Sequence, residues 1–248
     1  MQGYWAKMNR SARRRLLRIV GIILVASLPV VLAIWFAHLR AVSETSHQLR
    51  EFAARVMHKT ELVIHQADLA RDAAEKYQGN ICSDVHQKYM LNIIRGRLYV
   101  DDLIYARGQQ FICSTTSKPM EPYRMADPDY RRAPNIAIYY FRDMPFYPGY
   151  RMTYLQRGDY VAVINPLSFS EVVSGDEAVV YGVYDTITGA LFSVSESADA
   201  SKLHEFARHD ASAFQQDGRF YTIARSEKRP IAVIVATTRA RFYQNLYH

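Results

Sequence analysis

One uninterrupted apolar stretch constrains this chain more than any other feature. Residues Ile19 to Leu39 form a run of 21 residues without a full charge, and His38 is its one titratable side chain. An α-helix of that length spans about 30 Å, the thickness of the hydrocarbon core of a bilayer. A signal peptide has a shorter apolar region, and no convincing small-residue cleavage site follows this one. We therefore expect a transmembrane helix over 19–39, with a cleaved signal peptide as the alternative.

The basic character of the chain is concentrated before this stretch. The formal net charge is +7, and six of the cations lie in residues 1–18, which hold no acid: Lys7, Arg10, Arg13, Arg14, Arg15 and Arg18. Cationic flanks stay on the cytoplasmic side of a membrane, so we expect a cytoplasmic N-terminus and a main domain outside. That domain is close to neutral and has no basic stripe with interleaved aromatics, which argues against nucleic-acid binding. The partner predicted for this end is the lipid bilayer.

A second long helix is predicted from Val42 to Tyr77. Its apolar residues fall on one stripe, several of them seven apart, and Gly79-Asn80 gives a stop signal. The stripe predicts either docking on the chain's own domain or a homodimer through residues 42–77. His58 and His65 also lie seven apart on this helix, but no further clustered ligand follows, so a solvated face is favoured over a metal site.

The remainder of the chain predicts an α+β fold. A second helix can be capped by Ser83 or Asp84, and two strand-like runs, 98–106 and 110–115, flank Arg107-Gly108-Gln109 as a hairpin. We expect a mostly antiparallel sheet flanked by short helices. The further strands are predicted at 136–141, 150–155, 160–164, 178–184, 190–194, 219–224 and 231–236, the short helices at 168–173 and 201–208, and a helical run at 238–248.

The two cysteines carry the functional argument. Cys82 lies at the predicted start of the second helix and Cys113 lies on the second strand of the hairpin. In an oxidising compartment such as a bacterial periplasm, two cysteines normally form a disulfide. Such a bond is either an inert staple or a link that changes the domain when it is reduced. A thiol oxidoreductase is disfavoured because there is no Cys-x-x-Cys pair.

These residues resemble a known family. A cysteine that opens a helix, and a second followed by Ser114-Thr115, all beyond one membrane span, resemble the CSS-motif sensor domain of bacterial cyclic-di-GMP phosphodiesterases over about residues 13–243. The resemblance implies a single-pass inner-membrane protein. Its periplasmic domain would sense thiol status at Cys82 and Cys113 through the disulfide-forming machinery. The motif of the family is Cys-Ser-Ser, and Thr115 here keeps the hydroxyl.

No catalytic site is expected in this chain. The EAL hydrolase domain of the family should follow the sensor, whereas this sequence ends at His248 and contains no Glu-Ala-Leu. Ser174-Gly175-Asp176-Glu177 lacks the second glycine and the phenylalanine of a cyclase GGDEF turn. The serines near it have no nucleophile-elbow setting, and His209-Asp210 has no further metal ligand. Asp101-Asp102 is interpreted as a strand edge. We predict no cofactor and no metal.

We expect four segments along the chain and one leading function. They are a basic cytoplasmic tail (1–18), a transmembrane anchor (19–39), a juxtamembrane helix (40–80) and a periplasmic CSS-motif sensor domain (81–248). The leading hypothesis is a thiol-sensing regulatory domain of a cyclic-di-GMP phosphodiesterase. The alternatives are a ligand-binding sensor with a purely structural disulfide, and a periplasmic binding partner without a signalling role.

Overall fold

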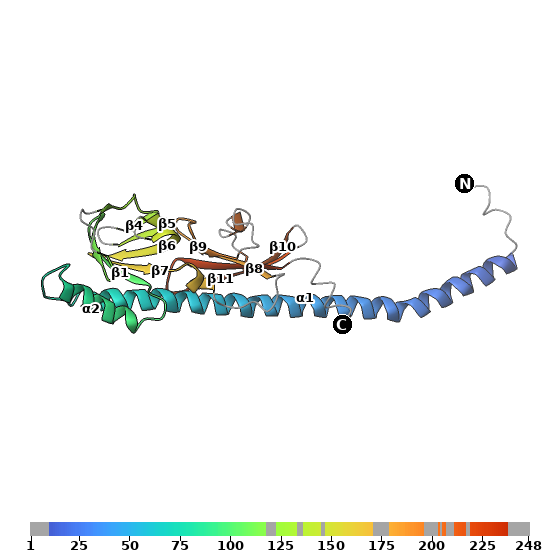
Figure 1. The fold of residues 1–248 in the computed structure, drawn as a ribbon. Helices are drawn as coiled ribbons and strands as arrows, with labels where there is room; N and C mark the ends of the chain where they lie inside the picture. The colour runs from blue at the N-terminus through green and yellow to red at the C-terminus, as the bar shows by residue number, and fades with distance from the viewer. Residues whose placement is uncertain are drawn as a thin grey trace. The chain divides into compact units, whose positions relative to one another are not determined.

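The computed structural model describes residues 10–117, 123–132, 136–144, 147–170, 179–195, 203, 205–206, 211–216 and 219–237. Within these residues the chain contains the long helix α1 (Arg10–Ala74), the short helices α2 (Asp84–Arg95) and α3 (Leu167–Ser170), and two antiparallel sheets (Figure 1). The predicted α+β class is confirmed. The single sheet that we expected is divided into two.

The two helices predicted over 19–39 and 42–77 form one continuous helix. It carries Pro29 inside it and ends at Ala74, three residues before the predicted end at Tyr77. The amides of Lys76 and Tyr77 donate to carbonyls three residues earlier, which closes the last turn tightly. The helix therefore ends before the Gly79-Asn80 signal is reached.

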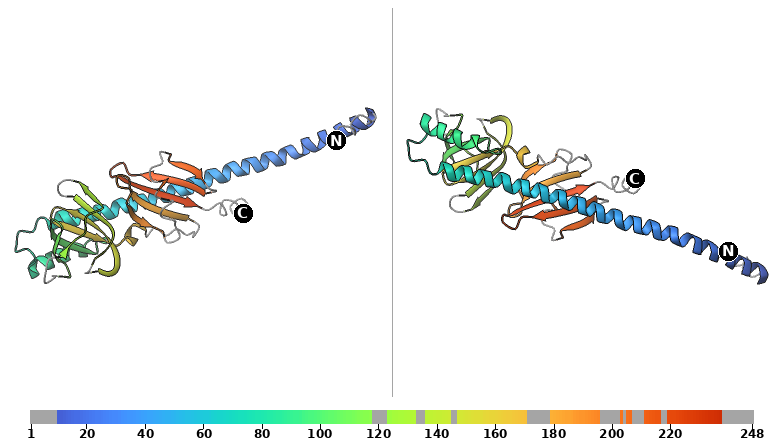
Figure 2. Two further views of the ribbon diagram at one scale, coloured as in Figure 1. Left: turned by 90° about the horizontal axis from the view of Figure 1, so that it is seen from above. Right: turned by 90° about the horizontal axis from the view of Figure 1, so that it is seen from below.

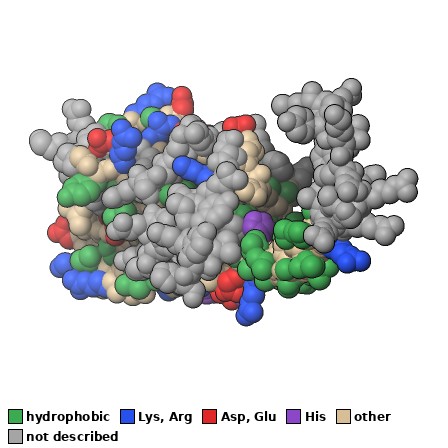
Figure 3. All heavy atoms as spheres, turned by 90° about the vertical axis from the view of Figure 1, so that its right-hand side faces the viewer, with side chains coloured by type: hydrophobic (Ala, Val, Ile, Leu, Met, Phe, Trp, Pro, Cys, Tyr) green, Lys and Arg blue, Asp and Glu red, His purple; other side chains and the backbone are tan. Residues whose placement is uncertain are grey.

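The first part of α1, up to His47, belongs to a different compact unit from Gln48–Arg239. Its apolar side chains are exposed, for example Val25 at 74% and Phe36 at 66%. Figure 3 faces this end of the molecule, where hydrophobic side chains gather on the surface. Among the described residues, α1 is the one helix long and apolar enough to cross a membrane.

From Gln48 onward, α1 runs along both sheets (Figure 2). The predicted apolar stripe is buried within this unit, and it narrows to alanines near the end of the helix, where Ala67, Ala70 and Ala74 are all at 0% exposure. The stripe thus docks on the chain's own domain, as one of the two interpretations predicted. A homodimer through residues 42–77 remains a prediction, and only the opposite, exposed face of the helix is available for it.

The first sheet has the strand order β3-β2-β1-β7-β6-β5-β4. Its strands are β1 (Asp102–Arg107), β2 (Gln110–Ser114), β3 (Tyr123–Arg124), β4 (Tyr130–Arg132), β5 (Ile136–Met144), β6 (Tyr147–Arg157) and β7 (Tyr160–Ile164). The predicted hairpin is β1–β2, which pairs Tyr105 with Cys113 and turns at Gly108, whose φ of +64° suits glycine. Pro148 and Gly149, which lie between the strands predicted at 136–141 and 150–155, belong to β6.

The second sheet has the order β10-β11-β12-β8-β9. Its strands are β8 (Val179–Asp185), β9 (Leu191–Val194), β10 (Ala213–Gln216), β11 (Arg219–Arg225) and β12 (Ile231–Thr237), and β10 was not predicted. All seven residues of β12 are buried. A central strand covered on both faces has this continuous apolar pattern instead of an alternating one.

Each sheet has a core of its own. Tyr139, Tyr154 and Phe111 are fully buried in the first core, and Tyr184, Tyr221 and Ile234 lie in the second. The helix predicted at 168–173 is α3, which ends at Ser170, and residues 171–178 lie outside the described residues. The predicted helical run 238–248 lies outside them too, as does most of 201–208.

Candidate functional site

A disulfide bond joins Cys82 to Cys113, with the two Cα atoms 5.8 Å apart. Cys82 lies two residues before α2, whose N-cap is Ser83, and Cys113 lies in β2. The bond therefore ties the start of α2 to the second strand of the hairpin. Both cysteines are buried, at 7% and 0% exposure.

Cys82 has an unusual backbone conformation. Its φ is +57°, and it is the one non-glycine residue with positive φ in the described part of the chain. The left-handed region costs a residue with a Cβ about 1 kcal/mol or more. The disulfide and a backbone hydrogen bond hold Cys82 in this conformation, since its amide donates to Nδ1 of His86 at 3.0 Å.

His86 is fully buried beside the disulfide. Because Nδ1 accepts from the Cys82 amide, the proton of the neutral ring lies on Nε2, which is 3.0 Å from the hydroxyl of Tyr160. The rings of Tyr77, Tyr105 and Tyr160 lie around it, with centroids 4.5, 5.8 and 6.0 Å away. Burial lowers the pKa of His86, so the ring is neutral at pH 7.

The hydroxyls of Ser114 and Thr115 are both engaged. Ser114 Oγ accepts from the amides of Thr116 and Ser117, at 3.2 and 3.0 Å, and shapes the turn after β2. Thr115 Oγ1 donates to Asp102 Oδ1, which also accepts from the amides of Leu103 and Thr115. These contacts fix the end of β2 directly after Cys113, and Asp102, which begins β1, anchors them.

The disulfide is close to a hollow in the surface. A pocket of about 660 Å³ is lined by Tyr77, Tyr105 and Tyr160, the three rings around His86. Of the two sulfur-bearing residues, Cys82 has the greater exposure. An external thiolate must reach a sulfur to open a disulfide.

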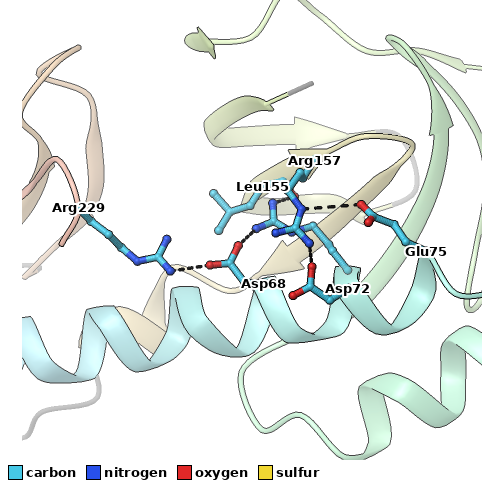
Figure 4. A network of polar contacts seen from close by, with 7 residues as sticks. Asp68, Asp72, Glu75, Leu155, Arg157 and Arg229 are labelled. Atoms are coloured by element: carbon cyan, nitrogen blue, oxygen red, sulfur yellow. Dashed lines mark hydrogen bonds and ion pairs between the residues drawn. The ribbon is translucent and has the colours of Figure 1, made fainter. Parts of the chain in front are cut away.

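A second polar cluster lies on α1, between the two sheets (Figure 4). Asp68 accepts from Arg71 on its own helix and from Arg229 of the loop before β12, the latter at 2.5 Å. Arg157 of β6 pairs with Asp72 and lies 3.7 Å from Glu75. The network therefore joins α1 to one strand of the first sheet and to a loop of the second.

Arg71 is the buried member of this network. It donates to the carbonyl of Leu155 at 2.8 Å and to Asp68, while its Nε is buried without a hydrogen-bond partner. Burial lowers its pKa, and the carboxylate of Asp68 offsets part of that effect. Arg71, Arg157 and Arg229 line a cavity of about 180 Å³ whose other walls are largely apolar.

Comparison with known proteins shows the family of this chain. A family model described as a CSS motif domain associated with EAL matches residues 45–248. The chain belongs to the CSS-motif domain family. The chain is 24% identical over 162 residues to the probable cyclic di-GMP phosphodiesterase PdeB of Escherichia coli K12. That match covers 64% of this chain and 31% of PdeB, so the chain spans about a third of this relative.

The CSS domain also shares its fold with solved extracellular domains. The extracellular domain of the putative histidine kinase rpHK1S-Z16 has a TM-score of 0.59 at 12% identity, over 82% of this chain and 98% of that one. The ligand-binding domain of Mlp24 with asparagine has a TM-score of 0.55 at 12% identity, over 86% and 99%. At this identity the likeness concerns the fold alone.

Other residues considered in the sequence do not join either cluster. His58 and His65 are exposed on α1. Among the described residues, the one group of three or more His, Cys, Asp and Glu side chains spaced for a metal ion is Cys82, His86 and Cys113. The segments 174–177 and 209–210 lie outside the described residues.

His86 was missed by the sequence analysis. The available signal was its position four residues after Cys82 at the start of a helix, which brings the two residues to the same side of the first turn. Its burial depends on Tyr160, which is 74 residues away in sequence.

Proposed function

We propose that this chain is a membrane-anchored periplasmic sensor domain that regulates a cyclic-di-GMP phosphodiesterase through the redox state of Cys82 and Cys113. Residues 1–18 form its cytoplasmic tail, 19–39 its anchor in the inner membrane, 40–80 its juxtamembrane helix and 81–248 its periplasmic domain. The observation that carries the proposal is the buried disulfide that holds Cys82 in a left-handed conformation at the start of α2. Membership of the CSS-motif family supports the link to an EAL enzyme.

Reduction would release the start of α2 from β2. Cys82 would then lose one of the two restraints on its positive φ, and relaxation of that residue would move the N-terminus of α2. This region contacts the end of α1 directly, since the hydroxyl of Tyr89 donates to the carbonyl of Ala73 at 2.8 Å and the ring of Tyr77 packs on His86. A change at the disulfide thus reaches α1, which continues back to the apolar segment.

The proposal is tested by the state of the thiols in living cells. The full chain is expressed in a bacterium with a periplasm, free thiols are trapped with a maleimide of high mass, and the protein is resolved on non-reducing gels. We expect an oxidised protein in normal growth and a modified protein after mild thiol stress or loss of the disulfide-forming machinery. A disulfide that stays intact under thiol stress would contradict redox sensing and identify an inert staple.

The matched control is the Cys82→Ser, Cys113→Ser variant, which cannot be modified under any condition. If the proposal holds, this variant locks a co-expressed EAL phosphodiesterase of the same family in one activity state, read as cellular cyclic-di-GMP. The purified chain itself is expected to hydrolyse no cyclic-di-GMP, with or without divalent metal. Turnover by the purified chain would refute the assignment of catalysis to another domain.

A ligand-binding sensor with a purely structural disulfide is the second candidate. The observation that favours it is the cavity beside Arg71, whose buried Nε has no partner and can donate to an acceptor atom of a small ligand. The fold shared with the ligand-binding domain of Mlp24 supports the same function. Thermal stabilisation by a small polar metabolite in the wild type but not in Arg71→Met, together with thiols that never change state, would favour this candidate.

A further inference from the structure

Three metal-binding side chains meet at the disulfide. Cys82, His86 and Cys113 each offer one ligand atom, and these atoms all lie within 4.8 Å of one another. All three residues are buried. In the oxidised protein the two sulfurs bond to each other and hold no charge for a cation. Reduction of the disulfide gives two thiols, which lie beside the neutral imidazole of His86.

The tautomer of His86 leaves Nδ1 as the nitrogen that can coordinate a metal ion. The lone pair of Nδ1 now accepts from the Cys82 amide, so a metal ion bound there would replace that hydrogen bond, while Nε2 carries the proton next to the hydroxyl of Tyr160. A histidine that ligates a metal through one nitrogen usually donates its other N–H to a fixed acceptor, which orients the ring. Tyr160, the first residue of β7, holds that position because its side chain is buried and packs against the ring of Tyr105.

The backbone geometry also suits a metal ion. Two sulfurs bound to one tetrahedral zinc ion, each at about 2.3 Å, lie about 3.8 Å apart. The Cα atoms of Cys82 and Cys113 are 5.8 Å apart, so rotation of the side chains reaches that separation without a large backbone movement. Zinc would replace the disulfide as the link between α2 and β2.

We propose that the reduced chain binds one Zn²⁺ through Cys82, Cys113 and His86, with water in the fourth position. An external dithiol supplies two electrons and two protons, becomes a disulfide itself and leaves two thiols on the chain. Zn²⁺ then displaces the two thiol protons to solvent and binds two thiolates and a neutral imidazole, a ligand set that zinc prefers. Tyr160 acts as a positioning residue for His86.

The site would give the reduced state a structure of its own. Two buried thiols beside a histidine would otherwise be free to re-oxidise or to separate. A bound zinc ion protects both thiolates from oxidation and keeps α2 near β2, so the reduced protein would respond to metal as well as to thiols. This inference requires reduction of the bond, but it does not depend on a role of that bond in signalling.

The test measures metal binding by the full chain in detergent micelles. The protein is reduced without oxygen, freed of reductant and titrated with Co²⁺, whose thiolate complexes have a charge-transfer absorption band. We expect the band to saturate at one equivalent and to disappear when Zn²⁺ is added. The oxidised protein should show no band. Absence of the band in folded reduced protein, or unfolding of the chain on reduction, would overturn the proposal.

Variants separate this site from adventitious binding. His86→Gln removes a ligand and should weaken Co²⁺ and Zn²⁺ binding by tenfold or more. Tyr160→Phe keeps the ligands and the packing, and loss of the hydrogen bond should weaken binding about tenfold. His65→Gln, on the exposed surface of α1, is the matched control and should bind as the wild type does. Equal affinity in the wild type and in both site variants would exclude His86 as a ligand.

The outcome can be distinguished from that of the proposed function. Redox sensing fails if the disulfide never opens in cells, whatever the reduced protein binds in vitro. The zinc site fails if the reduced protein binds no metal, even where the thiols do change state in cells.

Discussion

Removal of the disulfide gives the most direct test of how this domain is held together. The bond links residues 31 apart in sequence, and chain-entropy estimates for a loop of that size give about 3.7 kcal/mol of stabilisation. For a unit of roughly 190 residues, each kcal/mol shifts the unfolding midpoint by about 2–4 °C. Cys82→Ala with Cys113→Ala should therefore lower the midpoint by about 7–15 °C.

The backbone of Cys82 refines this prediction. At a φ of +57° alanine is strained, whereas glycine adopts that conformation freely. If residue 82 keeps this φ without the disulfide, the pair Cys82→Gly with Cys113→Ala should be about 1 kcal/mol more stable than the double alanine variant. The relaxation of residue 82 that the proposed function expects would reverse the order, because glycine gains more entropy on unfolding.

Thermal unfolding followed by circular dichroism measures both effects on the full chain in micelles, with and without reductant. Hydrogen exchange locates them, and we expect the largest loss of protection in α2 and β2. A midpoint shift below about 3 °C would refute the reasoning. So would unchanged exchange in α2 after the bond has been removed.

Three further substitutions test other buried contacts, each by the change in unfolding free energy. Thr115→Val removes the donor to the buried carboxylate that begins β1 and should cost about 2 kcal/mol, whereas Thr115→Ser keeps the hydroxyl and should cost about 1 kcal/mol or less. Arg71→Met should cost about 3 kcal/mol because it removes the hydrogen bond to the Leu155 carbonyl and one of the ion-pair partners of Asp68. An unchanged unfolding free energy would contradict the role of Arg71 in holding α1 against the first sheet. Tyr140→Phe should cost about 2 kcal/mol, since the hydroxyl of Tyr140 donates to the buried carboxylate of Asp185 in β8 at 2.9 Å. Tyr150→Phe, at an exposed position, is the control and should change the unfolding free energy by less than about 0.5 kcal/mol.

Local patterns account for what could be predicted. The apolar run, the stripe of α1, the Ser83 cap and the glycine turn of the β1–β2 hairpin each depend on residues within one or two turns of each other. The positions of Cys82 at a helix start and of Cys113 on a strand follow from the same signals. All seven of the further predicted strand segments coincide with strands, but the patterns did not detect β3 and β4, which are only two and three residues long, or β10, which is mostly exposed.

The tertiary structure alone decided how these pieces combine. β1 pairs with β7, and β12 pairs with β8, across more than forty residues in each case, so neither the division into two sheets nor their strand order follows from local patterns. The burial of His86 likewise depends on Tyr160, and that of Arg71 on Leu155, from distant strands. A side chain's burial depends on which distant segments cover it, and local patterns do not reveal those segments. The sequence by itself therefore determined only the elements and the positions of the cysteines on them. Packing determined the chemistry around them.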